Sequence, residues 1–130
     1  MKKNPATLIE QVRKIALSLD DATEKLSHGE PTFFAFGRTF AMIDNNHHDS
    51  GHVAVWLKAP PGAQESLVEA DPKHFFRPPY VGPSGWIGVR LDIDFDRGLA
   101  WPVIGDLIRQ AHAMNASAKK TRRRAAARRA

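Results

Sequence analysis

Two expected strands carry aromatic and basic residues that could bind a nucleic acid. Side chains alternate between the two faces of a strand, so Trp56 shares a face with Lys58, and Trp86 shares one with Arg90. Their aliphatic neighbours take the opposite face as core, and Arg38 and Phe40 could join the aromatic and basic set. Because rings stack on bases and cations contact phosphates, these residues predict a nucleic-acid-binding face on the open side of a sheet.

Two alternatives remain for the same aromatic residues. The loop at 79–85 is rich in Pro and Gly, and if it folds over Trp56 and Trp86, they form a second small core. Phe76, Tyr80 and Trp86 could otherwise line a cleft for a small molecule or a protein partner. In that case the protein is a binding module, and its basic tail serves solubility or targeting.

The basic residues are concentrated at the C-terminus. Residues 119–130 hold seven of the nineteen Lys and Arg and none of the fourteen Asp and Glu, which leaves a net charge of −2 on the first 118 residues. Such a tail contacts phosphates without reading sequence, although it could also be a solvated segment that aids solubility. The cations that we predict to bind nucleic acid here are Lys119, Lys120, Arg122, Arg123, Arg124, Arg128 and Arg129.

Two other groups could in principle hold a metal ion. The segment 45–52 contains three histidines, but neighbouring turn residues rarely converge on one ion, so we expect a polar hairpin. Asp92, Asp94 and Asp96 are spaced like the start of a calcium loop, but its twelfth position is Val103 instead of an acid. We therefore predict helix-entry acids here, no metal site and no cofactor.

The sequence offers little for catalysis. Ser27, His28 and Glu30 are too close in sequence for a catalytic relay, and neither GxGxxG nor GxxxxGK occurs. There is no cysteine, which excludes thiol chemistry and suits the cytoplasm, and no apolar run approaches the length of a membrane span. We expect a non-enzymatic cytoplasmic protein that does not enter a membrane.

The elements that position these residues follow from hydrophobic periodicity and turn residues. Two long helices with apolar stripes lie near the ends of the chain, and both need one surface to cover. The sequence therefore predicts an α+β two-layer sandwich, in which an antiparallel sheet of four to five strands is covered on one face by the N- and C-terminal helices. The expected helices are 5–19, 63–70 and about 102–117, the strands are 33–36, 38–44, 53–58, 86–92 and a brief 74–76, and 20–30 is a polar connection.

An ordered set of residues resembles the bacterial MmcQ/YjbR family over residues 5–115. No single motif carries the resemblance; the set runs through Ser27, Gly29, Pro31, Phe33, Gly37, Arg38, Phe40, Ala41, Leu57, Lys58, Pro79, Tyr80, Gly82, Trp86, Leu91 and the helix from Trp101 to His112.

The resemblance implies a CyaY-like fold and a DNA-binding function without an agreed set of catalytic residues. Arg38 stands where many relatives have Lys. We accordingly assign residues 1–117 to an MmcQ/YjbR-like domain and residues 118–130 to a basic tail that we expect to be disordered when free. The expected partner is nucleic acid, with DNA favoured.

Overall fold

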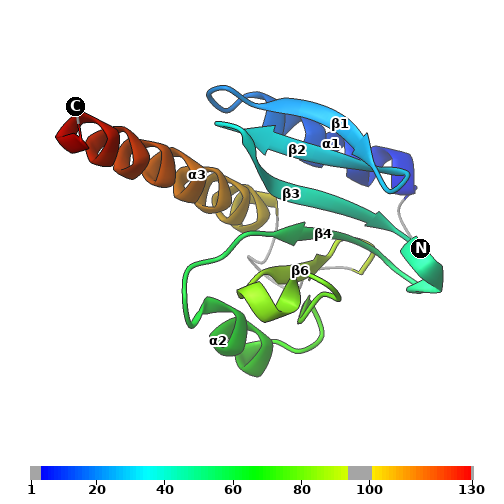
Figure 1. The fold of residues 1–130 in the computed structure, drawn as a ribbon. Helices are drawn as coiled ribbons and strands as arrows, with labels where there is room; N and C mark the ends of the chain where they lie inside the picture. Colours follow the sequence, from blue (N-terminus) through cyan, green and yellow to red (C-terminus); the bar gives the residue numbers. More distant parts are fainter. Residues whose placement is uncertain (1–3, 94–100, 130) are drawn as a thin grey trace.

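The computed structural model describes residues 4–93 and 101–129. Figure 1 shows an open sheet with α1 and α3 packed against it and α2 beyond the β4–β6 end. Along the chain the elements are α1 (Pro5–Leu17), β1 (Thr23–Ser27), β2 (Glu30–Ala35), β3 (Arg38–Asn45), the 3-10 turn η1 (His47–Asp49), β4 (Val53–Leu57), α2 (Ala63–Ala70), β5 (Phe75–Phe76), the 3-10 turn η2 (Gly82–Ser84), β6 (Ile87–Arg90) and α3 (Trp101–Arg129).

Within the described residues, the sheet has six strands in the order β1-β2-β3-β4-β6-β5, and all of their pairings are antiparallel. Met42 of β3 lies opposite Trp56 of β4, while Ile43 lies opposite Val55. Since neighbouring residues face opposite ways, these pairs mark the two faces of the sheet. Phe40 has no partner in the β2–β3 register, which makes it a bulge in β3.

Both terminal helices bury an apolar stripe against one face of the sheet. Leu8 and Val12 of α1 and Ile104 and Ile108 of α3 are fully or almost fully buried, in one cluster with residues such as Val55. The side chain of Asn4 accepts a hydrogen bond from the backbone N–H of Ala6, so it caps α1 as the sequence predicts. The predicted α+β sandwich, with both helices on one face, is confirmed.

Two local predictions are wrong. The polar connection expected at 20–30 contains β1, which pairs with β2 along its whole length. Arg13 of α1 supports this edge strand, because its guanidinium donates to both carboxylate oxygens of Glu24, at 2.7 and 2.9 Å. Such a bidentate contact is among the stronger polar contacts of a protein surface. This contact helps to hold β1, which contains few apolar residues.

The second error concerns the end of the last helix. We expected it to stop near residues 115–117, but α3 continues without a break to Arg129 (Figure 1). Ala, Arg and Lys are strong helix formers, and the buried first half of α3 already supplies the nucleus that an isolated helix lacks. The structure therefore describes residues 118–129, which we expected to be disordered, as a helical extension of the domain. Below, these residues are called the α3 extension.

Candidate nucleic-acid interface

The two tryptophans of the expected binding face are buried. Trp56 is 4% exposed and Trp86 is 7% exposed, so the prediction that they form an open aromatic platform is wrong. The covering comes from the loop that includes Val81, whose carbonyl accepts the backbone N–H of Trp86. Gln64 of α2 donates to the carbonyls of Gly82 and Trp86 and ties the loop down. The burial of both rings agrees with the alternative in which this loop folds over them.

The cations of the expected face separate into two places. Arg90 lies at the end of β6, where its Nε donates to Asp92 at 2.9 Å, so a carboxylate balances its charge. Lys58 follows β4 and lies close to Arg38 at the start of β3, beside α3. The structure thus brings Lys58 and Arg38 together and leaves Arg90 apart from them.

Lys58 and Arg38 form the base of a basic cluster with Arg122 of the α3 extension. Burial lowers the pKa of Lys58 below its ordinary value, and the nearby charges of Arg38 and Arg122 lower it further. A lowered lysine pKa means that the surroundings disfavour its positive charge. An anionic group placed among these three cations would offset the repulsion between them and favour the charged form of Lys58.

Asn115 of α3 fixes the position of Lys58 within this cluster. Its Oδ1 accepts a hydrogen bond from Nζ of Lys58 at 2.6 Å, and its Nδ2 donates to backbone carbonyls of the β2–β3 hairpin at Ala35, Arg38 and Thr39. The side chain is buried, at 1% exposure. We did not select Asn115 from the sequence, although a signal was present, since a polar residue continues the stripe through Ile108 and Ala111.

The first turn of the α3 extension rests on the tip of the β2–β3 hairpin. Nζ of Lys119 lies 4.9 Å from the ring centre of Phe36, and Arg122 donates to the Phe36 carbonyl at 3.3 Å. The hairpin turns at Phe36 and Gly37, both with positive φ angles. Lys119 and Arg122 join Arg123 and Asp21 in lining a shallow depression of about 460 Å³. The carboxylate of Asp21 in this depression already accepts a hydrogen bond from the backbone N–H of Phe36.

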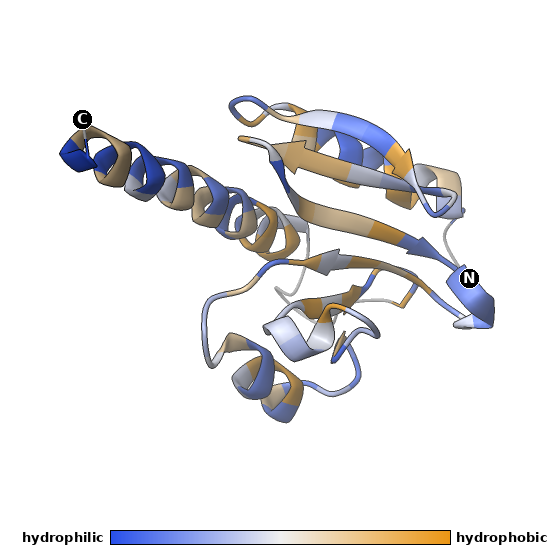
Figure 2. Cartoon of the chain, in the orientation of Figure 1, coloured by the Kyte–Doolittle hydropathy of each residue, from blue (hydrophilic) through white to orange (hydrophobic). Residues whose placement is uncertain are grey.

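The outer part of the extension presents cations to solvent. Lys120, Arg124 and Arg128 follow one another at i, i+4 and i+8, so they form one exposed stripe along the helix. No acidic residue occurs after Asp106, and within the described ranges no ion pair involves a cation of the extension. Figure 2 shows the outer half of α3 as alternating hydrophilic and weakly hydrophobic residues, clear of the sheet. The fold and this region together define an α+β protein with a basic helical projection.

Comparison with known proteins gives the family. The YjbR family model matches residues 17–114, which is most of the chain, so the chain belongs to the YjbR (MmcQ/YjbR) family. The crystal structure of the Deinococcus radiodurans protein DR2400, described as a DUF419 domain, is similar with a TM-score of 0.67. That match has 19% sequence identity and covers 85% of this chain and 80% of DR2400. No curated protein matches.

None of the helices formed by residues 4–93 and 101–129 is both long enough and apolar enough to cross a bilayer. The 29-residue α3 has the length, but its last twelve residues are the basic extension.

Proposed function

We propose that this protein binds nucleic acid, DNA in particular, through the α3 extension and the cluster at its base, without catalysing a reaction. The observation that carries the proposal is the concentration of cations at this end of the molecule. Arg122 lies beside Lys58 and Arg38, and Lys120, Arg124 and Arg128 form the exposed stripe on the opposite side of the helix. Phosphates of a duplex offer the negative charge that such a helix attracts. We place this activity in the cytoplasm, where a bacterial chromosome lies.

The proposed contacts are with phosphates and carry little sequence information. Cations on a helix neutralise phosphates and release bound counterions, which gives affinity that falls steeply with salt. The rings first expected to stack on bases, Trp56 and Trp86, are buried and have no part in the proposal. Binding should therefore be similar for duplexes of different sequence.

A charge-neutralised variant tests the proposal without shortening the helix. Arg122, Arg123, Arg124, Arg128 and Arg129 are all replaced by Gln, which is also a strong helix former. We expect the affinity for a labelled duplex at low salt to fall by at least about a hundredfold, measured by fluorescence anisotropy, because several phosphate contacts are lost together. An unchanged affinity would exclude the extension as the binding element.

The control neutralises three exposed cations elsewhere on the molecule, two fewer than the extension variant. Lys14 of α1, Lys25 of β1 and Lys73 before β5 are exposed and lie outside the α3 extension. Their replacement by Gln removes positive charge but leaves the extension and the cluster at its base unchanged. We expect only a small loss of affinity. A loss as large as in the extension variant would show that net charge alone determines binding.

A further inference from the structure

A separate cavity of about 470 Å³ lies on the face of the sheet that α1 and α3 do not cover. Its floor includes Met42 and Trp56, which are cross-strand partners and point away from the core side taken by Ile43 and Val55. The β1–β2 hairpin, η1 and the loop after β5 form its walls. A cavity of this volume is within the range that small-molecule sites occupy. The lining residues that matter here are Glu30, Met42, His47, His48, Trp56 and Tyr80.

Trp56 lines this cavity and carries a buried polar atom. The side chain is 4% exposed, and its indole Nε1–H has no hydrogen-bond partner among the described residues. Buried donors in proteins are nearly always paired, because an unpaired one loses its hydrogen bond to water without replacement. A ligand with an acceptor atom would supply the partner that Trp56 lacks.

Two ionisable side chains of the cavity lie beside each other. His47 Nδ1 lies 3.5 Å from a carboxylate oxygen of Glu30, and both side chains are mostly buried. Burial raises the pKa of Glu30, although the His47 charge opposes this effect. Among the residues that the structure describes, the lining contains no Lys or Arg. Because an anion would meet no fixed positive charge here, the cavity favours a neutral ligand.

Aromatic rings give the cavity a wall suited to a flat molecule. The His47 ring meets Trp56 edge-on at 6.3 Å and lies 4.1 Å from His48, which in turn meets Tyr80 at 6.4 Å. Ring contacts of these kinds favour planar aromatic partners. His28, His48 and Tyr80, all at the cavity, have positive φ angles of 54°, 49° and 64°. Such conformations cost free energy and cluster at ligand sites.

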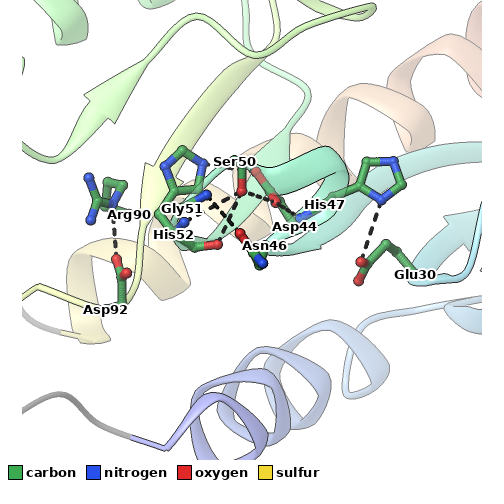
Figure 3. Close-up of polar contacts among 9 residues, drawn as sticks. All are labelled: Glu30, Asp44, Asn46, His47, Ser50, Gly51, His52, Arg90 and Asp92. Atoms are coloured by element: carbon green, nitrogen blue, oxygen red, sulfur yellow. Dashed lines mark hydrogen bonds and ion pairs between the residues drawn. The ribbon is translucent and has the colours of Figure 1, made fainter.

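Asp44 holds the His47 wall in place. This carboxylate is buried at 1% exposure and accepts hydrogen bonds from the backbone N–H of His47, the hydroxyl of Ser50 and Nε2 of His52 (Figure 3). His47 then reaches Glu30 from the end of this network. The wall is therefore organised by the fold and does not need a ligand to form.

We propose that this cavity binds a neutral, planar heteroaromatic molecule of nucleobase size, with an acceptor for Trp56 Nε1–H and an N–H donor for Glu30. The stacking wall selects the flat ring, and a lining whose described residues include no Lys or Arg disfavours an attached phosphate. This inference is independent of the proposed function, because the cavity residues are not part of the basic cluster or the α3 extension.

The test uses the full chain with hypoxanthine and uracil as probes. Each neutral base is titrated by NMR while the indole N–H signal of Trp56 is followed, and its affinity is measured by calorimetry. We expect at least one base to bind and to move that signal downfield, since a new acceptor forms a hydrogen bond. If neither base binds at millimolar concentration, or if binding leaves the signal in place, the proposal is wrong.

Two variants and one control locate the binding. Trp56→Phe keeps the ring but removes Nε1–H and should weaken binding about tenfold. Tyr80→Gly removes a ring that is 74% exposed and relieves a positive φ angle, so it tests the wall without threatening the fold. Lys120→Gln in the extension should have no effect on base affinity. Equal base affinity in all three variants would overturn the proposal, whatever the outcome of DNA binding.

Discussion

Asn115 shows how a single side chain can join the basic cluster to the core. It receives a hydrogen bond from Lys58 and gives hydrogen bonds to three carbonyls of the β2–β3 hairpin. In this way α3, the end of β4 and the hairpin are fixed relative to one another. The cation pattern could be read from the sequence, but this arrangement could not, because it depends on residues 35 to 39, 58 and 115 meeting in space.

The first prediction concerns the stability that Asn115 provides. Asn115→Ala leaves Lys58 without its side-chain acceptor and three carbonyls without this donor. Unpaired buried groups are costly, so we expect the free energy of unfolding to fall by about 2–4 kcal/mol, measured by urea denaturation. Ser117→Ala, at an exposed site of the same helix, is the control and should cost under about 0.5 kcal/mol. Equal costs for the two variants would contradict the role of Asn115.

A second prediction follows from the lowered pKa of Lys58. Arg38→Gln removes one of the two charges that disfavour its protonated form, so the pKa should rise toward its ordinary value, as followed by NMR titration of the lysine signals. In the parent chain, stability gains from this group as pH rises from the folded pKa to the unfolded pKa, and the variant should gain less. Arg109→Gln, whose side chain pairs with Asp106, is the control. A fall in the Lys58 pKa would show that Arg38 does not disfavour the charged form of Lys58, contrary to the basic cluster described above.

At the scale of elements, the α3 extension differs most from expectation. Its composition is that of a charged tail, and composition alone indicates disorder for such a segment. The composition of the extension does not include the effect of the preceding buried part of α3, which starts the helix. Repulsion still opposes it, because Lys119 and Arg123, like Lys120 and Arg124, are like charges spaced at i and i+4. The free extension should therefore be helical but weakly protected.

The third prediction uses this repulsion. Duplex DNA that neutralises the cations should stabilise the helix, so amide hydrogen exchange of residues 122–129 should slow when DNA is added. The amides of α1, away from the interface, serve as the internal reference and should not change. Faster exchange in the extension on adding DNA would mean that binding unfolds the helix, contrary to the proposed contact.

The edge strand β1 is a second element that the sequence did not predict. Its sequence has one apolar residue, Leu26, which is 75% exposed, so no alternating pattern could reveal the strand. What holds it is pairing with β2 and the contact from Arg13 to Glu24. By contrast, β3, β4 and α2 were predicted closely, because β3 and β4 contain runs of apolar residues bounded by turn residues and α2 lies between Gly62 and Pro72.

The fourth prediction tests the contact between α1 and β1. Arg13→Gln removes the bidentate contact with Glu24 and the one with Glu10, and we expect a loss of about 0.5–1.5 kcal/mol in unfolding free energy. Because ion pairs at a partly exposed site are screened, the loss should shrink at high salt. Lys14→Gln, the neighbouring cation, is the control. A loss that does not depend on salt would point to packing instead of charge.

At the scale of the whole molecule, the two faces of the sheet have different roles. One face makes the main core with α1 and α3, and the other holds the covered tryptophans and the proposed base-binding cavity. Strand alternation predicted which residues share a face. It could not predict that the loop around Val81 covers Trp86, because loop placement depends on contacts such as those of Gln64.

Charge is also divided at this scale, between a domain with a small negative balance and a basic helical projection. This division predicts that nearly all nucleic-acid affinity resides in the projection. It also predicts that the domain without the projection repels a polyanion weakly, apart from the cluster at Lys58 and Arg38. The salt dependence of binding measures both effects directly.

The most direct measurement is the affinity of the full chain and of residues 1–118 for one duplex across a series of salt concentrations. The full chain should show a steep slope of log affinity against log salt, up to about −6 if all seven cations of the extension contact phosphates. The shortened chain should bind weakly at the lowest salt and with a shallow slope. If both chains give the same affinity and the same slope, the α3 extension does not bind DNA and the central claim is wrong.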